Sequence, residues 1–194
     1  MLRRSLEMTF EELSEEMYED LCGFVRSVES SPTGEYIVKL EFDSSWDGGK
    51  RRFVTLSFTD VAETSCDTGF CGSVCCYEEH VLLLNHNCRH ESVYFSTAPD
   101  DSEKIIGRVY SAHCKKFGNW RNLGDYWHAN EENLDSGNGL LFRGPSLIGD
   151  VYCEALAGSL SFSRISGHTP SGGYIAYFID NHFVLAKSVR LFEE

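Results

Sequence analysis

Two pairs of alternating segments constrain the fold of this chain more than any other feature. Glu35–Phe42 and Arg51–Phe58 are rich in β-branched and aromatic residues, and the turn sequence WDGG lies between them. Tyr174–Ile179 and Phe183–Val189 form a similar pair around the turn sequence DN. Alternating apolar residues on both sides of a short Gly- or Asn-containing turn are typical of β-hairpins. The sequence therefore predicts an antiparallel sheet built of several hairpins.

Two further segments have helical periodicity. Apolar residues recur every three or four positions from Thr9 to Ser27, and Thr9 with Glu12 fits a capping box. Asp100–Phe117 has the same spacing, with Asp101 or Ser102 as cap and Gly118 just past its end. The order of elements predicts an α+β fold, in which an N-terminal amphipathic helix and a second helix near residues 102–117 pack on the antiparallel sheet.

The middle of the chain is less regular. Val74–Leu84 and Cys88–Phe95 are expected to form another hairpin, around Asn85-His86-Asn87. Residues 119–139 are expected to form a long surface segment with a helical turn. Residues 140–142 and 151–162 remain open between strand and helix, with strand favoured after Ala157.

Composition indicates one acidic globular domain over residues 1–194. The chain carries 17 Lys and Arg against 30 Asp and Glu, a net charge of −13. This surplus repels a phosphate backbone, so we expect no direct nucleic-acid binding. It favours a basic protein partner, although many soluble proteins are acidic without having one.

The apolar pattern predicts a soluble protein of the cytoplasm. The first 21 residues contain an acidic amphipathic run where an export signal would have an apolar core. The longest apolar runs are far shorter than the roughly 20 residues needed to span a bilayer. With eight cysteines and no expected export, we predict reduced thiols in the cytoplasm.

The stretch from Cys66 to His90 holds five of the eight cysteines and three of the seven histidines. If the hairpin around residues 85–87 forms, alternation places several of these side chains on one face. Zinc is bound by four Cys and His ligands, and such a face could hold it. The other interpretation is that the thiols pack as small apolar groups. The candidate zinc ligands are Cys66, Cys71, Cys75, Cys76, His80, Cys88 and His90.

A cysteine hydrolase is a further alternative. The segment GFCGSVCCY at residues 69–77 resembles the nucleophile segment of papain-like cysteine peptidases, and DNHFV at residues 180–184 resembles the segment in which their histidine enters a strand. This resemblance implies Cys75 or Cys71 as nucleophile and His182 as base. The chain departs from the family pattern because Val74 lies inside the motif and no Trp follows the cysteine.

The leading hypothesis is a non-enzymatic interaction protein. No catalytic constellation is complete and no cofactor motif occurs, so neither an enzymatic activity nor a cofactor is expected. Exposed Trp and Tyr residues anchor protein interfaces. The acidic segment from Trp120 to Asp135 contains two Trp and one Tyr. We therefore expect an inhibitor-like or immunity-protein-like domain that binds and regulates a basic protein. Its predicted interface residues are Trp120, Asp125, Tyr126, Trp127, Glu131 and Glu132.

Overall fold

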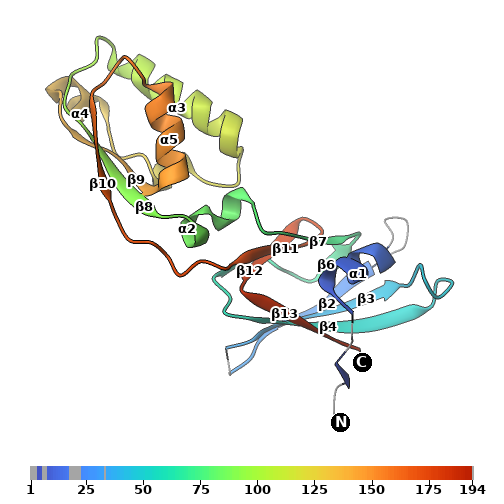
Figure 1. Ribbon diagram of the computed structural model, residues 1–194. Helices are drawn as coiled ribbons and strands as arrows, with labels where there is room; N and C mark the ends of the chain where they lie inside the picture. The colour runs from blue at the N-terminus through green and yellow to red at the C-terminus, as the bar shows by residue number, and fades with distance from the viewer. Residues whose placement is uncertain (1–3, 6–7, 18–22, 33, 194) are drawn as a thin grey trace. The chain divides into compact units, whose positions relative to one another are not determined.

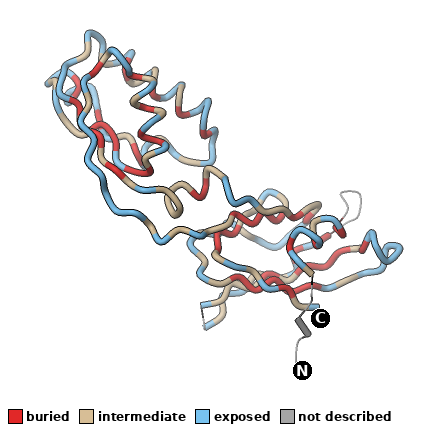
Figure 2. Tube along the Cα trace, in the orientation of Figure 1, coloured by how far each residue is buried: buried red, intermediate tan, exposed pale blue. Residues whose placement is uncertain are grey.

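A computed structural model describes residues 4–5, 8–17, 23–32 and 34–193, which form antiparallel sheets and several helices. The α+β prediction is confirmed (Figure 1). The chain divides into two compact units. Unit 1 comprises residues 1–80 and 173–194, and unit 2 comprises residues 81–172. Each unit has its own buried core (Figure 2). The expected single domain over residues 1–194 stays a prediction.

In the part that the structure describes, unit 1 consists of two antiparallel sheets and one short helix. The larger sheet has the order β1-β13-β4-β3-β2-β6, and its strands are β1 (Arg4–Ser5), β2 (Gly23–Ser30), β3 (Tyr36–Asp43), β4 (Arg51–Thr59), β6 (Gly69–Cys71) and β13 (Ser188–Glu193). The smaller sheet has the order β5-β12-β11-β7, and its strands are β5 (Glu63–Thr64), β7 (Val74–Tyr77), β11 (Ile175–Ile179) and β12 (His182–Ala186). Strand pairs β4/β5, β6/β7 and β12/β13 are each nearly continuous in the chain, so the sheets join at three places.

Both hairpins predicted from the paired alternating segments are confirmed. Strands β3 and β4 pair from Tyr36 opposite Phe58 to Asp43 opposite Arg51. Gly48 and Gly49, in the turn between them, have φ values of 65° and 83°, which glycine adopts without steric cost. Strands β11 and β12 pair across a tight turn, as the alternation predicted.

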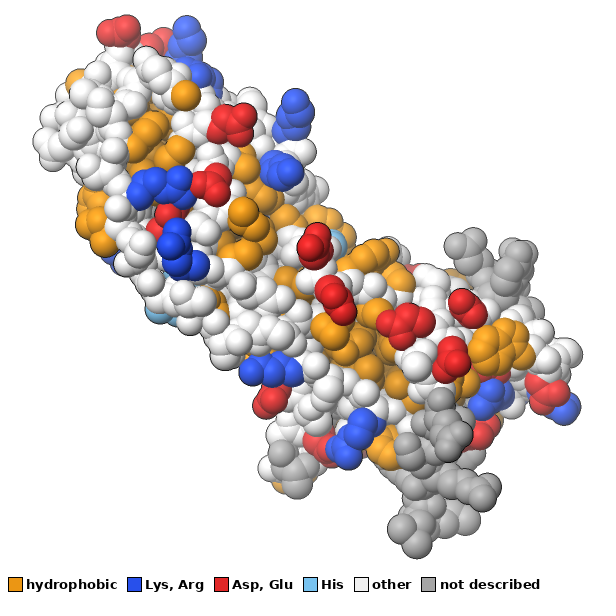
Figure 3. All heavy atoms as spheres, in the orientation of Figure 1, with side chains coloured by type: hydrophobic (Ala, Val, Ile, Leu, Met, Phe, Trp, Pro, Cys, Tyr) orange, Lys and Arg blue, Asp and Glu red, His pale blue; other side chains and the backbone are white. Residues whose placement is uncertain are grey.

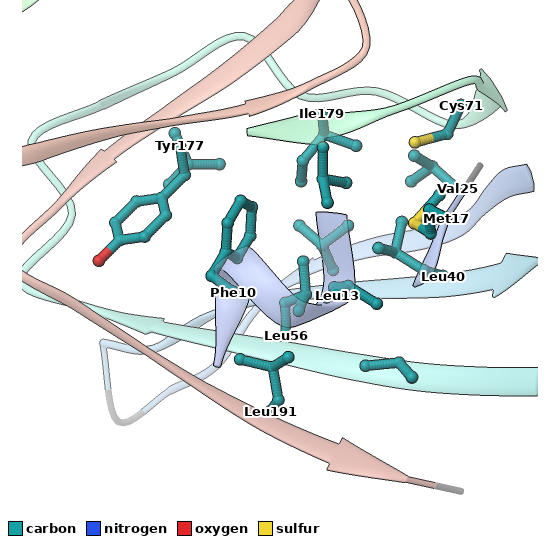
Figure 4. Packing of buried hydrophobic residues seen from close by; sticks show 14 of the residues in the cluster. Phe10, Leu13, Met17, Val25, Leu40, Leu56, Cys71, Tyr177, Ile179 and Leu191 are labelled. Carbon is teal, nitrogen blue, oxygen red and sulfur yellow. The ribbon is translucent and has the colours of Figure 1, made fainter. Parts of the chain in front are cut away.

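Helix α1 (Phe10–Glu16) fills the core between the two sheets. Its buried side chains point toward Val25, Leu40 and Ile179, which come from both sheets (Figure 4). The Thr9 capping box is confirmed, because the Glu12 N–H donates to Thr9 Oγ1 at 3.1 Å and the Thr9 N–H donates to Glu12 Oε2 at 2.7 Å. The local capping chemistry thus positions the helix start.

The predicted helix Thr9–Ser27 is too long. Residues 18–22 lie outside the described residues, and from Gly23 onward the chain is strand β2. A Cβ atom on Gly23 would lie 2.5 Å from the carbonyl oxygen of Cys71, so the absence of a side chain permits close pairing with β6. Gly23 and Val25 are buried and Phe24 is exposed, the period-two pattern of a strand.

Unit 2 is a three-stranded sheet with helices. The strands, in the order β10-β8-β9, are β8 (His90–Phe95), β9 (Gly139–Pro145) and β10 (Phe162–Ser166). The α-helices are α2 (Leu84–Asn87), α3 (Ser102–Phe117), α4 (Glu131–Ser136) and α5 (Ser146–Ala155), with 3₁₀ turns at Val81–Leu83 and Leu123–Asp125. The second predicted helix is confirmed as α3, with Asp101 capping its start through Lys104 N–H. Residues 151–155 are helical, and the strand expected after Ala157 begins only at Phe162, the first residue of β10.

The predicted hairpin between Val74–Leu84 and Cys88–Phe95 is wrong. Strand β7 pairs with β11, which lies about 100 residues later in the chain, and β8 pairs with β9 and β10. Residues 81–87 between them form a 3₁₀ turn and the short helix α2, whose end is marked by the Cys88 N–H donating to the Leu84 carbonyl oxygen at 3.1 Å. No helix among the described residues is long and apolar enough to cross a membrane.

Candidate functional site

The proposed zinc ligands are divided between the two units. Cys66, Cys71, Cys75, Cys76 and His80 belong to unit 1, and Cys88 and His90 belong to unit 2. The shared face that sequence reasoning predicted depended on a hairpin that does not form. Among the described residues, no group of three or more His, Cys, Asp or Glu side chains is placed to hold a metal ion.

Burial keeps three of these thiols protonated. It raises the pKa of Cys71 to about 12, and the Cys71 Sγ donates to the Ser73 carbonyl oxygen at 3.5 Å. Burial likewise raises the pKa of Cys66 and of Cys76 to about 11. The thiolate is the form that binds metal and attacks electrophiles, so these three side chains are poor ligands and poor nucleophiles near neutral pH.

The strand register separates the cysteine and histidine of the hydrolase alternative. Val74 lies opposite Ile179, which lies opposite His182, so these side chains share one face of the four-stranded sheet. Cys75 is one residue further along β7 and therefore points to the other face. The His182 Nδ1–H donates to the Ser65 carbonyl oxygen at 2.7 Å. The geometry does not bring Cys75 and His182 together as nucleophile and base.

The predicted partner-binding residues lie in unit 2, and they differ in exposure. Asp125, Glu131 and Glu132 are exposed, and Trp120 is 46% exposed. Tyr126 is buried, and its hydroxyl donates to Asn85 Oδ1 at 3.1 Å, so it belongs to the core. Trp127 is half-buried and packs edge-to-face on Tyr152, with ring centroids 6.1 Å apart. The segment therefore presents fewer aromatic groups than its sequence suggested.

The two exposed glutamates of that segment have a local role. Glu131 and Glu132 lie in the first turn of α4, whose N-cap is Asn130. Negative side chains at this end of a helix interact favourably with the helix dipole. Their presence is explained without a partner.

The negative charge of the chain is concentrated in unit 1. Unit 1 contains nine Lys and Arg and twenty Asp and Glu, a net charge of −11. Unit 2 contains eight Lys and Arg and ten Asp and Glu, a net charge of −2. An acidic binding surface is therefore to be sought on unit 1.

Unit 1 has a groove of about 630 Å³ beside the start of α1, within the size range of ligand-binding sites. Figure 3 shows acidic side chains around an apolar patch on this part of unit 1. Four segments that are distant in the sequence line the groove: Met8–Glu11, the residues Cys76 and Glu78, the residues Ile175 and Tyr177, and Val189–Leu191.

The floor of the groove is apolar and rigidly packed. The Phe10 ring lies edge-on to the Tyr177 ring, with ring centroids 5.1 Å apart. The Phe58 ring also lies edge-on to the Tyr177 ring, with ring centroids 5.3 Å apart. Burial raises the pKa of Tyr177 to about 12, so its hydroxyl is neutral at physiological pH. Ile175 and Val189 are half-buried beside these rings. The groove therefore has a largely apolar floor.

The rim of the groove carries two carboxylates. Hydrogen bonds from its own main-chain N–H and from the Cys76 thiol lower the pKa of Glu11, so its carboxylate stays ionised. The Cys76 Sγ lies 3.2 Å from Glu11 Oε1. Among the described residues, no Lys or Arg pairs with Glu11 or Glu78, and the one lining cation, Arg190, donates to Glu35 at 2.6 Å. The rim therefore offers negative charge to a ligand.

Sequence reasoning missed this groove because pairings over long sequence distances assemble it. Glu11 lies in the first turn of α1, where its charge also interacts favourably with the helix dipole. The run Glu78-Glu79 directly after strand β7 was the signal available in the sequence, but its proximity to Glu11 depends on the packing of α1 along β7.

No protein-family model, curated protein or solved structure matches the chain. The fold itself defines an α+β protein of two compact units.

Proposed function

We propose that the chain is a protein-binding module whose unit 1 groove takes up a basic segment of a partner protein. The observation that carries the proposal is the combination of an apolar floor with the carboxylates of Glu11 and Glu78, for which the described residues provide no cationic partner. Apolar surface removed from water supplies affinity of about 25 cal/mol per Å² before the costs of association are subtracted. The carboxylates supply orientation and preference for cations.

The charge of unit 1 supports a basic rather than an acidic partner. A net charge of −11 attracts a cationic protein over long range and raises its association rate, an effect that salt screens. The same charge repels nucleic acid. We therefore retain a basic protein as partner and propose no direct nucleic-acid binding.

The biological role that fits this chemistry is inhibition or regulation of the basic partner, in the manner of an immunity protein. Occupying a cationic surface of a nuclease or of a nucleic-acid-binding protein would block its access to phosphate. We propose a cytoplasmic location, supported by eight cysteines for which no disulfide is expected. The binding surface in this proposal is the groove rather than the segment from Trp120 to Glu132.

The test compares two charge reversals that change the net charge equally. The probe is a short basic peptide with one Leu flanked by two Arg, and affinity is measured by fluorescence anisotropy at low salt. Glu11→Lys with Glu78→Lys should weaken binding at least tenfold. The control, Glu131→Lys with Glu132→Lys, should change affinity by less than twofold, because its reversed charges lie in unit 2.

Equal losses of peptide affinity in both variants would show that only the net charge matters. A larger loss in the control would place the binding site on the segment from Trp120 to Glu132 instead. Glu11 lies in the first turn of α1, so its reversal also weakens the helix slightly. The single variant Glu78→Lys avoids this, because Glu78 lies outside the helices and strands. It should weaken binding severalfold with no change in stability.

A further inference from the structure

Three phenylalanines are exposed on one face of the six-stranded sheet of unit 1. Phe24 on β2, Phe53 on β4 and Phe70 on β6 are 37%, 43% and 55% exposed. Apolar residues on a sheet normally occupy the buried face, and three exposed rings are therefore a costly arrangement unless another surface covers them.

The strand register aligns these rings in a single row. Phe24 lies opposite Phe70 on one side and opposite Glu41 on the other, and Glu41 lies opposite Phe53. Directly opposed residues of antiparallel strands point to the same face. Phe24 and Phe70 are edge-to-face with ring centroids 6.1 Å apart. The row thus crosses four neighbouring strands, and a buried glutamate lies between the second and third rings.

Charges on this face are balanced internally. The Glu41 carboxylate accepts hydrogen bonds from both Arg26 and Arg51, which hold its pKa at about 2. Arg51 also pairs with Asp43 at 2.5 Å, and the Arg26 guanidinium lies 5.6 Å from the centroid of the Phe24 ring. Two cations and two anions therefore lie among the rings, within a unit whose net charge is −11.

This composition selects one kind of partner. Exposed aromatic rings with arginines are typical of the centres of protein interfaces. A nucleic acid is disfavoured because both arginines already bind carboxylates and the unit is acidic. A basic protein would be attracted only weakly to this face, because the face has no surplus negative charge. A surface that is apolar and carries both charge signs is instead complementary to itself, as a two-fold interface requires.

We propose that this face, centred on Phe24, Phe53 and Phe70, is the interface through which two copies of the chain form a symmetric dimer. The rings of one copy interdigitate with those of the other, while the Arg26 and Arg51 guanidinium groups stay paired with Glu41 and Asp43 of their own copy. Two sheets packed in this way lie about 10 Å apart. Elsewhere on unit 1 the like charges of two copies repel each other.

Dimerisation adds a property that the groove alone does not have. A dimer carries two grooves, so a partner with two basic segments is bound more tightly than a partner with one, provided that both grooves can be occupied together. The dimer does not depend on the groove function, because the two surfaces are formed by different residues.

The test measures oligomeric state by sedimentation equilibrium from 1 to 200 μM. Wild-type protein is expected to dimerise within this range, and Phe24→Ser with Phe53→Ser should raise the dissociation constant at least thirtyfold while the circular dichroism spectrum is unchanged. Trp46→Ser is the matched control, since it removes a ring that is 56% exposed but lies in the turn before β4. It should leave the dissociation constant within twofold.

The salt dependence separates this proposal from the groove function. Dimerisation should strengthen as salt rises, because screening weakens the repulsion between two acidic copies, whereas peptide binding in the groove should weaken. A wild-type protein that remains monomeric at 200 μM would overturn the proposal. So would a dimer that survives both Phe substitutions, or loss through these substitutions of binding to a single-stranded oligonucleotide.

Discussion

The two units have similar lengths, 102 and 92 residues, but they use charge in different ways. Unit 2 is nearly neutral, and its exposed acids Glu131 and Glu132 lie at a helix start where they favour the fold. Unit 1 carries most of the negative charge, with Glu11 and Glu78 beside an apolar groove. The net charge of a chain therefore says little about where a partner binds until that charge is divided among the folding units.

Each unit buries a glutamate that forms an ion pair with an arginine, and the two pairs differ in how far the arginine is exposed. In unit 1, Glu16 is fully buried and accepts from Arg52 Nη1 at 2.6 and 2.8 Å. In unit 2, Glu91 is 3% exposed and accepts from Arg164 Nη2 at 2.5 Å. Arg52 is 20% exposed and Arg164 is 40% exposed, so water replaces a lost partner more readily in unit 2.

Neutralising these glutamates should give the largest effects. Glu16→Gln leaves Arg52, which is only 20% exposed, with the 48% exposed Glu193 as its remaining carboxylate, and should lower the free energy of unfolding by about 3 kcal/mol. Glu91→Gln should cost about 1 kcal/mol, because Arg164 keeps Asp150 and solvent. Urea unfolding followed by tryptophan fluorescence measures both, with Trp46 reporting on unit 1 and Trp120 and Trp127 on unit 2. The reverse order of the two costs would contradict the comparison.

Acid should affect unit 1 through Glu41. Its folded-state pKa of about 2 lies below the ordinary value of 4.5, because Arg26 and Arg51 bind the carboxylate. A depressed pKa contributes stability that is fully present above pH 4.5 and is lost as the pH falls toward 2. The effect is smaller than that of Glu16→Gln, since both arginines are substantially exposed.

The measurement is the urea midpoint of wild type and of Glu41→Gln at several pH values. The two proteins should differ at pH 7 and converge as the pH falls from 4.5 to 2.5. A difference that is independent of pH would show that Glu41 stabilises the sheet through packing rather than through its charge.

Local chemistry made part of this fold predictable. Alternation with turn residues defined the β3–β4 and β11–β12 hairpins, and Asp101 with Gly118 defined helix α3. Capping residues and turn residues act over a few positions, so their effects can be read from the sequence. The same reasoning placed the start of α1 at Thr9.

The features that the sequence did not predict depend on the pairing of strands that are distant in the chain. Strand β7 takes β11 as its partner across all of unit 2, so sequence reasoning wrongly paired it with the next alternating segment. Reading Phe24 as part of a helix hid the exposed aromatic row, although the alternation of Gly23, Phe24 and Val25 was a usable signal. The groove could not be foreseen, because it joins four segments through these pairings.

The last prediction concerns the insertion of unit 2 into unit 1 and has the smallest expected effect. Tyr77 of β7 lies directly opposite Ala176 of β11, so the two ends of the inserted segment are neighbours in the sheet. Replacing residues 80–173 by a two-residue Asn-Gly turn should join β7 and β11 as a hairpin. All residues that line the groove remain, so peptide affinity should change by less than twofold.

Circular dichroism and the anisotropy titration with the Leu-Arg peptide check this outcome. Unit 1 should keep its sheet signal because its core contains no residue of unit 2. An unfolded product would support the single-domain prediction for residues 1–194, since unit 1 would then need unit 2 for stability. A folded product that has lost the peptide would contradict the groove as the binding site, because apart from His80 and Gly173 only unit 2 would have been removed.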